Sequence, residues 1–246
     1  MTMLKDILSD IVAHTHSLGF LPLAKITGDD TATTIESMAD DRSVILVATT
    51  KEPVSVFQGV FGMPNLDKLN LHLKNPEYRE NASIDVAYAD RNNVKIPVGL
   101  RFENQSRDFS NDYRFMNVEI INEKMKTVKF KGAAWNVEFS PSASSIARLR
   151  LQAQANSEES VFQVKIEGEN LVLFFGDAST HAGSFVFEPN VNKKLKQTWA
   201  WPVQQVMSIL SLSGDKVMRI ADAGAMQITV DSGMAVYNYI LPAMSK

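Results

Sequence analysis

Residues that could carry out catalysis are few in this sequence and are poorly spaced for it. The chain holds four histidines, His14, His16, His72 and His181, and no cysteine. His14 and His16 are two positions apart, so on a helix they point in different directions and do not readily chelate one metal ion. Because cysteine is missing, disulfides, thiolate metal sites and cysteine nucleophiles are excluded.

Acidic and glycine-rich motifs add no catalytic centre. Neither GxxxxGK[ST] nor GxGxxG opens a helix. The pairs Asp29-Asp30 and Asp40-Asp41 could bind Mg²⁺ in a nuclease, but solvated turn residues explain them more simply. We therefore expect a binding or structural protein rather than an enzyme, with no catalytic residue, no metal ion and no cofactor.

The segment "SIARLRLQAQAN", Ser145 to Asn156, is the charge pattern that indicates a ligand. The chain is mildly acidic, with 28 Asp and Glu against 25 Lys and Arg. From residue 140 to 157 there is nevertheless no acidic residue, while Arg148 and Arg150 lie in the middle. Exposed helices usually mix both charges for i,i+4 pairs, so this helix favours contact with a polyanion. A solvated face is the simpler alternative.

Other predicted helices are also low in acid. The segment 66–75 carries two lysines and a histidine against Asp67, and the helix 202–212 has no charge. Lys and Arg would contact phosphates without reading bases, and Gln could hydrogen-bond to the backbone. We predict a sequence-independent surface for a polyanion, formed by Lys5, His16, Lys68, His72, Lys74, Arg148, Arg150 and Gln152.

Hydrophobic spacing predicts the elements that position these side chains. The first is an amphipathic helix from Thr2 to Leu18, ended by Gly19. In the first half, strands are expected at 21–27, 33–38, 43–50 and 55–63, a helix or strand at 66–75, and a hairpin at 82–103. In the second half, strands or hairpins are expected at 128–140, 160–177, 183–190, 198–201 and 215–243, with helices at 142–156 and 202–212.

The order of these elements repeats. The second half runs strand, helix, three strands, and then the same again, while the first half lacks only a clear opening strand. We predict an α+β fold with two domains, each a double βαβββ repeat. The domains are placed at 1–117 and 128–246 with a connector at 118–127, although the unusual stretch "PVGLRFENQSRDFSNDYRFMN" makes the first boundary harder to assign.

Composition sets the broad class of the protein. The chain has 246 residues, of which 45% are hydrophobic and 22% charged, as in globular proteins. Asp6 and Asp10 interrupt the apolar residues of the N-terminal segment, which argues against a signal peptide. No stretch approaches the length of a membrane span. We expect a cytoplasmic protein, in the host cytoplasm if it is viral, with no membrane partner.

The double βαβββ pattern with low-acid helices resembles the DNA polymerase sliding clamp family. The likeness is strongest to the T4-like bacteriophage type, which begins almost directly with a helix, as "MTMLKDILSDIVAHTH" does. "SVFQGVFGMPNLDKLNLHL", "SIDVAYADRNNVKI" and "SIARLRLQAQANSEESVFQVKIEGENLVLFF" are similar to later clamp segments. "VYNYILPA" resembles the Tyr-x-x-Pro end of eukaryotic and archaeal clamps.

The resemblance implies that the protein encircles DNA as a closed ring and catalyses no reaction. Two-domain clamps form homotrimeric rings whose helices line a DNA-filled hole and whose sheets form the outer wall. Such a ring tethers the DNA polymerase, is opened by a clamp-loader ATPase, and binds partners through a short hydrophobic peptide. The groove for that peptide is expected around Val44, Leu46, Val118, Ile120, Tyr239, Leu241 and Pro242.

Two alternatives stay open. The chain could be a β-rich structural or assembly protein of the virion type, without DNA binding. A nuclease or other DNA enzyme is the third interpretation.

Overall fold

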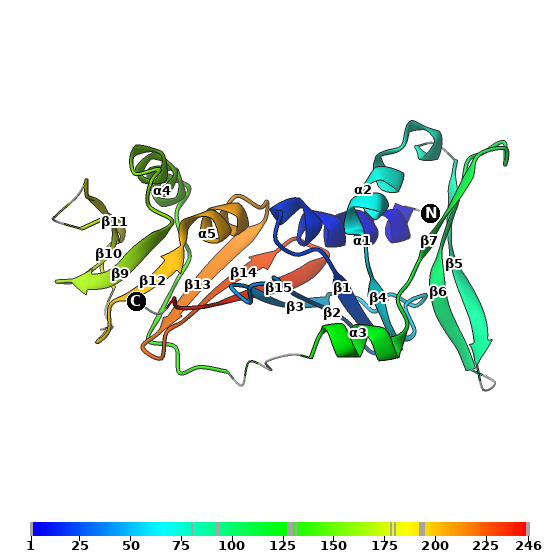
Figure 1. Ribbon diagram of the computed structural model, residues 1–246, viewed down its shortest axis with the longest axis horizontal. Coiled ribbons are helices and arrows are strands. Elements are labelled where there is room, and N and C mark those ends of the chain that lie inside the picture. Colours follow the sequence, from blue (N-terminus) through cyan, green and yellow to red (C-terminus); the bar gives the residue numbers. More distant parts are fainter. Residues whose placement is uncertain are drawn as a thin grey trace. The chain divides into compact units, whose positions relative to one another are not determined.

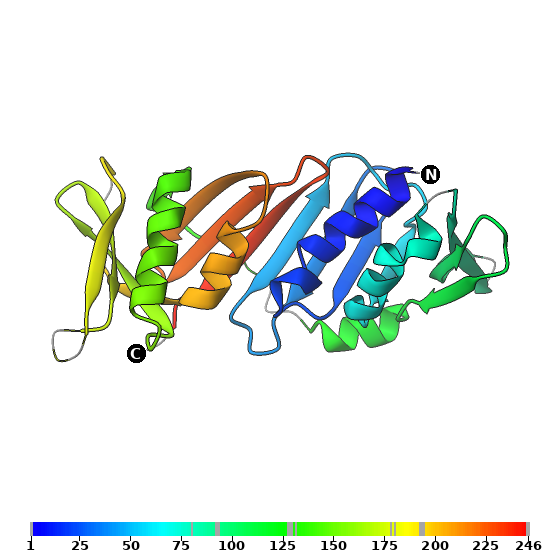
Figure 2. The same cartoon turned by 90° about the horizontal axis from the view of Figure 1, so that it is seen from above.

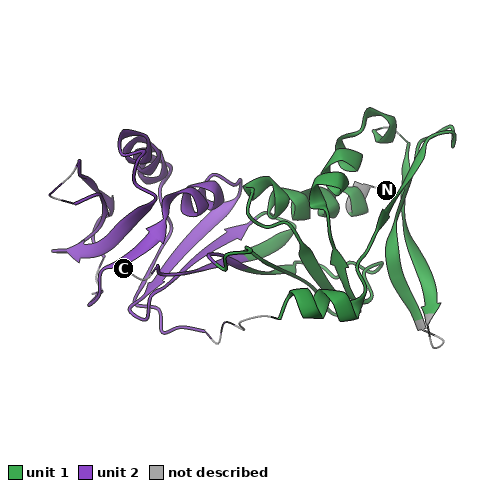
Figure 3. Cartoon of the chain, viewed as in Figure 1, with its two compact units in different colours: residues 1–42, 46–128, 232–237 green, residues 43–45, 129–231, 238–246 purple. Residues whose placement is uncertain are grey.

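The computed structural model describes residues 2–79, 81–91, 94–126, 130, 132–177, 179, 181–191 and 195–244. The chain divides into two compact units (Figure 3), which are unit 1 with residues 1–42, 46–128 and 232–237, and unit 2 with residues 43–45, 129–231 and 238–246. Helices and antiparallel strands alternate in both units, so the predicted α+β class is confirmed.

Unit 1 contains three α-helices and seven strands of its own within the described residues. In chain order these are α1 (Thr2–Ala13), β1 (Ala24–Gly28), β2 (Thr33–Met38), β3 (Ile45–Thr50), β4 (Gly59–Met63), α2 (Leu66–Lys74), β5 (Ser83–Arg91), β6 (Val94–Glu103), β7 (Ser110–Arg114) and α3 (Val118–Lys124). The short 3-10 helices η1 (His16–Leu18) and η2 (Pro76–Tyr78) follow α1 and α2. The strands form one sheet in the order β4-β1-β2-β3 and another in the order β5-β6-β7.

The helices of unit 1 cover both faces of the first sheet. α1 and α2 lie on one face and α3 lies on the other (Figure 1). α1 contributes Ile7, Leu8 and Ile11 to the core. On the opposite face Ile121 packs on β4 at Gly62, where an added Cβ would lie 2.8 Å from the Ile121 Cδ1 atom. Glycine at this position therefore allows α3 to approach the sheet closely.

Unit 2 repeats the arrangement with an additional first strand. Its elements are β8 (Val137–Phe139), α4 (Ala143–Ala155), β9 (Val161–Glu167), β10 (Asn170–Phe175), β11 (Gly183–Glu188), β12 (Trp199–Pro202), α5 (Val203–Leu210), β13 (Asp215–Ala221), β14 (Ala225–Asp231) and β15 (Ala235–Pro242). The sheet orders are β11-β10-β9-β12 and β15-β14-β13-β8. Within this unit α4 and α5 lie side by side (Figure 2).

The two halves correspond element by element. From α1 to β7 the order is the same as from α4 to β15, so that β3 corresponds to β11, β5 to β13 and β7 to β15. Isolated bridges support this match, because the second residue after β7 pairs with β4 (Gly62 with Met116) and the second residue after β15 pairs with β12 (Ala200 with Met244). β15 is shared between the units, since residues 235–237 belong to unit 1, and it lies beside β3.

Three predicted details are wrong. The first helix ends at Ala13 rather than Leu18, because the chain then turns into η1, which Gly19 ends with φ 86°. Pro202 is the residue before α5 and the last residue of β12, not the first helical residue. β8 spans 137–139 rather than 128–140, and residues 127–129 and 131 lie outside the described residues.

Two elements near the predicted connector were not expected. β7 covers 110–114 and α3 covers 118–124. The signal for α3 was present, since Asn117 caps the helix by accepting a hydrogen bond from the Ile120 amide, and Ile121 and Met125 are buried one turn apart. The domain limits of 1–117 and 128–246 stay a prediction. Among the described residues, no helix has the length and hydropathy needed to cross a bilayer.

Candidate nucleic-acid interface and partner groove

α4 presents the two arginines of the acid-free segment at the surface. The helix begins after Ser142, whose hydroxyl accepts a hydrogen bond from the Ser145 amide at 3.0 Å. The Arg148 guanidinium donates to the Val186 carbonyl at 3.2 Å and lies over the Phe185 ring. Arg150 donates to Ser211 at 3.3 Å, which links α4 to the end of α5. Each guanidinium has five N–H donors, so both keep donors for a phosphate.

Gln152 is less available than expected. Its Oε1 atom accepts a hydrogen bond from Asn156, and an added Cβ on Gly183 would lie 2.4 Å from the same atom. The Gln152 side chain therefore lies against the start of β11. Leu151, which sequence reasoning did not assign to the surface site, is 65% exposed on this helix.

α2 carries a row of exposed side chains one turn apart. Lys68 and Lys74 are exposed, and Leu71 between them is 68% exposed. His72 instead packs on the core ring of Phe102, with ring centroids 5.1 Å apart. Partial burial, together with the charge of Lys68, holds the pKa of His72 below its ordinary value. The His72 side chain is thus half-buried against Phe102 of β6, and its lowered pKa favours the neutral form.

α1 contributes little free positive charge. The Lys5 ammonium donates to the Tyr78 carbonyl at 2.7 Å and so ties α1 to η2. His16 is half-buried in η1. Of the residues predicted in unit 1, Lys68 and Lys74 are thus the cations best placed to meet a phosphate.

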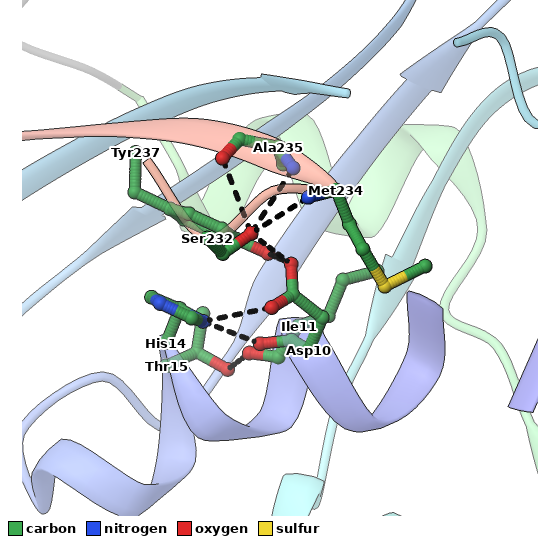
Figure 4. Close-up of polar contacts among 8 residues, drawn as sticks. All are labelled: Asp10, Ile11, His14, Thr15, Ser232, Met234, Ala235 and Tyr237. Carbon is green, nitrogen blue, oxygen red and sulfur yellow. Dashed lines mark hydrogen bonds and ion pairs between the residues drawn. The ribbon is translucent and has the colours of Figure 1, made fainter. Parts of the chain in front are cut away.

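A cluster of polar side chains joins α1 to the turn between β14 and β15 (Figure 4). The Asp10 carboxylate accepts hydrogen bonds from Ser232 at 2.9 Å and from Tyr237 at 2.8 Å, and lies 3.3 Å from His14 Nδ1. The His14 and Tyr237 rings stack with centroids 4.1 Å apart. Burial raises the pKa of Asp10, but the hydrogen bonds from His14, Tyr237 and Ser232 outweigh it and hold the pKa below its ordinary value.

This cluster has the residue types of a Ser-His-Asp centre but a different order of contacts. A nucleophilic serine needs the histidine as its base. Here the carboxylate stands between the two, with Ser232 and His14 on separate oxygens. His14 is 2% exposed. The arrangement therefore fits a structural tie between α1 and the turn.

The acidic pairs considered as Mg²⁺ ligands also lie in turns. Asp29 Oδ1 accepts hydrogen bonds from the backbone of Thr31 and Ala32 and from the Thr31 hydroxyl. Asp30 accepts one from Gln58. Within the described part of the chain, no group of three or more histidine, cysteine, aspartate and glutamate side chains could hold a metal ion.

A cavity of about 460 Å³ borders α3 and contains two of the predicted partner residues. We call it the α3 groove. Val118 and Ile120 line one side, and the apolar residues Val60, Phe61, Ile96, Pro97, Val98, Phe115 and Met116 line the rest. Ile120 is 45% exposed. A large apolar side chain could therefore enter this groove without displacing the core.

The other predicted groove residues lie elsewhere. Val44, Leu46, Tyr239 and Leu241 are completely buried among the strands, so their side chains offer no surface to a partner. Pro242 is exposed at the end of β15. The structure thus brings together the two residues of α3, and not the set of seven.

β7 and β11 each lie at the edge of a sheet, where another chain could pair with them. Within the described residues, β7 pairs with β6 and β11 pairs with β10, and neither has a strand on its other side. The corresponding strands β15 and β3 are neighbours in one sheet. Exposed strand edges readily form hydrogen bonds with further strands.

Comparison with known proteins identifies the fold. No family model and no curated protein matches the sequence. Among solved structures, PCNA from Thermococcus kodakaraensis matches with a TM-score of 0.68 at 11% identity, covering 98% of this chain and 97% of that chain. Proliferating cellular nuclear antigen from Entamoeba histolytica matches with a TM-score of 0.65 at 9% identity, covering 98% and 95%.

A third match is to PCNA of A. fulgidus bound to the C-terminal region of FEN-1. Its TM-score is 0.66 at 10% identity, covering 99% of this chain and 96% of that one. The chain therefore has the α+β fold of PCNA-type sliding clamps, with two similar domains. A closer relationship to the T4-like bacteriophage type stays a prediction.

Proposed function

We propose that this chain is the subunit of a DNA sliding clamp, a homotrimeric ring that encircles duplex DNA and tethers a DNA polymerase. Its domains are 1–117 and 128–246, joined at 118–127. In this proposal the chain is a scaffold and not an enzyme. It works in the cytoplasm, or in that of a host cell if the protein belongs to a T4-like bacteriophage.

The pair of free edges at β7 and β11 carries the proposal. β3 and β15 already pair within the chain, and β11 and β7 are their counterparts. If β11 of one copy pairs with β7 of the next, the same pairing is repeated between subunits. Such a head-to-tail contact closes into a ring when the rotation between copies allows it.

The helices supply the DNA-facing surface in this proposal. The cations of this surface are Lys68 and Lys74 on α2 and Arg148 and Arg150 on α4, while Lys5, His16, His72 and Gln152 play smaller parts because they are largely used inside the fold. A few cations per subunit attract phosphates without reading sequence, which suits a ring that must slide.

Protein partners would bind on the opposite face of unit 1, at the α3 groove. An apolar groove beside a short helix suits a short hydrophobic peptide, such as the tail of a polymerase. The complex of A. fulgidus PCNA with the C-terminal region of FEN-1 supports a peptide-binding role. A clamp-loader ATPase is the further partner expected of a closed ring.

Cross-linking through introduced cysteines tests the ring. The natural chain has no cysteine, so Asp112→Cys in β7 and Ser184→Cys in β11 would be the reactive sites, joined by a short bismaleimide. We expect the double variant to form covalent species up to a trimer of three times 27.3 kDa and none larger.

Each single variant is the matched control and should give no covalent trimer. Light scattering on the unmodified chain should give the same trimer mass. A strict monomer over a wide concentration range would contradict the proposal and favour the structural or assembly protein. An open ladder beyond three copies would indicate a filament instead of a ring.

A further inference from the structure

β5 is the outer strand of its sheet, and Ile84 and Asp85 near its start line a cleft. It pairs with β6 along its length, and the described residues place no strand on its other side (Figure 1). A cavity of about 540 Å³ lies between β5 and residues 50–56, which are the last residue of β3 and the loop that follows it. We call it the β5 cleft. Such an edge presents unpaired N–H and C=O groups to any extended chain that enters.

The β5 cleft has mainly apolar walls. Leu4 and Ile7 of α1, Val54 and Val56 of the loop, Ile84 of β5 and Met234 line it. The Tyr88 hydroxyl donates to the Val56 carbonyl at 3.0 Å, so the loop is fastened to β5. The cleft therefore combines a backbone edge with apolar side-chain sites, as in grooves that bind peptides by strand addition.

Unit 2 shows what fills the corresponding place. The counterpart of β5 is β13, and its outer edge is covered by β8, with Met218 opposite Phe139 and Ile220 opposite Val137. β8 also borders the loop after β11, since residues 137–139 and 188–191 line one cavity. Because β3 corresponds to β11, the loop after β3 is the counterpart of the loop after β11. The β5 cleft is thus the place that a strand occupies in unit 2.

The chemistry of β8 indicates the occupant. Val137 is 1% exposed and Phe139 packs on Phe187, while Glu138 between them forms an ion pair with Arg219 at 2.8 Å. Alternate residues of a strand point to opposite faces, so the two apolar side chains share a face. In unit 1 three exposed charged side chains line the β5 cleft, namely Lys51, Glu52 and Asp85, and two of them are acidic. A basic residue is therefore favoured between the two apolar ones.

We propose that the β5 cleft binds an extended segment of another protein with the pattern apolar-basic-apolar, which adds to β5 as an antiparallel strand. Main-chain hydrogen bonds to β5 hold the segment, and the apolar side chains fill the cleft. Such binding needs neither DNA nor a ring and is a function beyond that of a clamp.

A peptide derived from the chain itself is the probe. The peptide consists of residues 133–142, which include β8, and carries the substitution Glu138→Lys. It is labelled with a fluorescent dye, so that its binding to the full chain can be measured by fluorescence anisotropy. We expect saturable binding and slower hydrogen exchange in β5. The unchanged peptide with Glu138 should bind about threefold more weakly, the size of an exposed charge pair. The variant Asp85→Lys should reverse this preference.

Two controls separate strand addition from other modes of binding. The same peptide with alternate backbone nitrogens methylated keeps its side chains but loses donors, and should bind about tenfold more weakly. Val54→Asp, in the opposite wall, should also weaken binding without changing Tm. Equal binding of the methylated peptide, no saturable binding, or slower exchange in β13 in place of β5 would each overturn the proposal.

Discussion

The carboxylate of Asp10 holds three side chains from two distant parts of unit 1. Ser232 and Tyr237 donate to one oxygen and His14 lies near the other. Asp10 is more than 200 positions from Ser232 and Tyr237 in the sequence. The cluster therefore fastens α1 to the segment 232–237 within unit 1.

Asp10→Ala should lower the free energy of unfolding by about 2–3 kcal/mol, because it removes the carboxylate that accepts hydrogen bonds from Ser232 and Tyr237 and lies beside His14. Asp6→Ala on the exposed face of the same helix is the control and should change stability by less than about 0.5 kcal/mol. Urea denaturation followed by circular dichroism measures both. Equal effects of the two variants would contradict the structural role of the cluster.

The pH dependence of this effect has a definite sign. The pKa of Asp10 in the fold lies below its ordinary value of 3.8. Its carboxylate therefore stabilises the fold above that value, and the contribution is lost as the pH falls through the lower, folded pKa. The stability difference between the natural chain and Asp10→Ala should be constant near neutral pH and shrink below 3.8. A difference that grows on acidification would be inconsistent with this pKa.

Arg148→Ala with Arg150→Ala should weaken binding to a short DNA duplex and leave the oligomer intact. Each lost phosphate contact should reduce the slope of log Kd against the logarithm of the salt concentration by about one. Fluorescence anisotropy at several salt concentrations gives both quantities. Lys95→Ala with Lys196→Ala removes the same charge from exposed sites off the helices and should have a smaller effect. Equal effects of the two pairs would mean that α4 does not contact DNA.

Among the helices and strands, α3 has the largest effect on where a partner peptide is expected to bind. It converts the expected connector into a helix whose inner side chain Ile121 is buried on β4, while Ile120 stays 45% exposed at the α3 groove. Neighbouring residues of one helix thus have opposite roles. Ile121 holds the helix in place, and Ile120 is available to a ligand.

Ile120→Glu should reduce the binding of a polymerase tail peptide by about tenfold or more, because it places a charge in an apolar groove. Its effect on unfolding should be small, since the side chain is exposed. Glu123→Ala on the same helix is the matched control. Isothermal titration calorimetry measures the peptide affinity. Unchanged affinity in Ile120→Glu would place the peptide site elsewhere.

For the whole molecule, a ring would hold DNA by topology rather than by affinity. The double variant Asp112→Cys and Ser184→Cys, cross-linked in the presence of a circular plasmid, should stay with the plasmid at high salt, where electrostatic contacts are screened. Cutting the plasmid once should release it. Cross-linking before the plasmid is added is the control and should leave the DNA free. Release at high salt without cutting would argue against encirclement.

Local patterns predicted much of the fold. Helical spacing located α1, α4 and α5, while at α2 the pattern allowed either a helix or a strand. Alternation with turn residues located most strands, because these signals depend on neighbours in sequence. The repeated order of elements then indicated two similar α+β domains. β7 was missed because its sequence "SNDYR" is polar and has little alternation, and Tyr113 alone is buried in it.

The site was predicted less well, because side-chain direction depends on distant partners. The sequence by itself determined that α2 and α4 are poor in acid and that catalytic and metal-binding motifs are few. Only the tertiary structure decided that Lys5 binds Tyr78, that His72 faces Phe102, and that Val44, Leu46, Tyr239 and Leu241 are core residues. The same holds for the free edges at β5, β7 and β11, since a strand's own residues do not state whether a neighbour lies beside it.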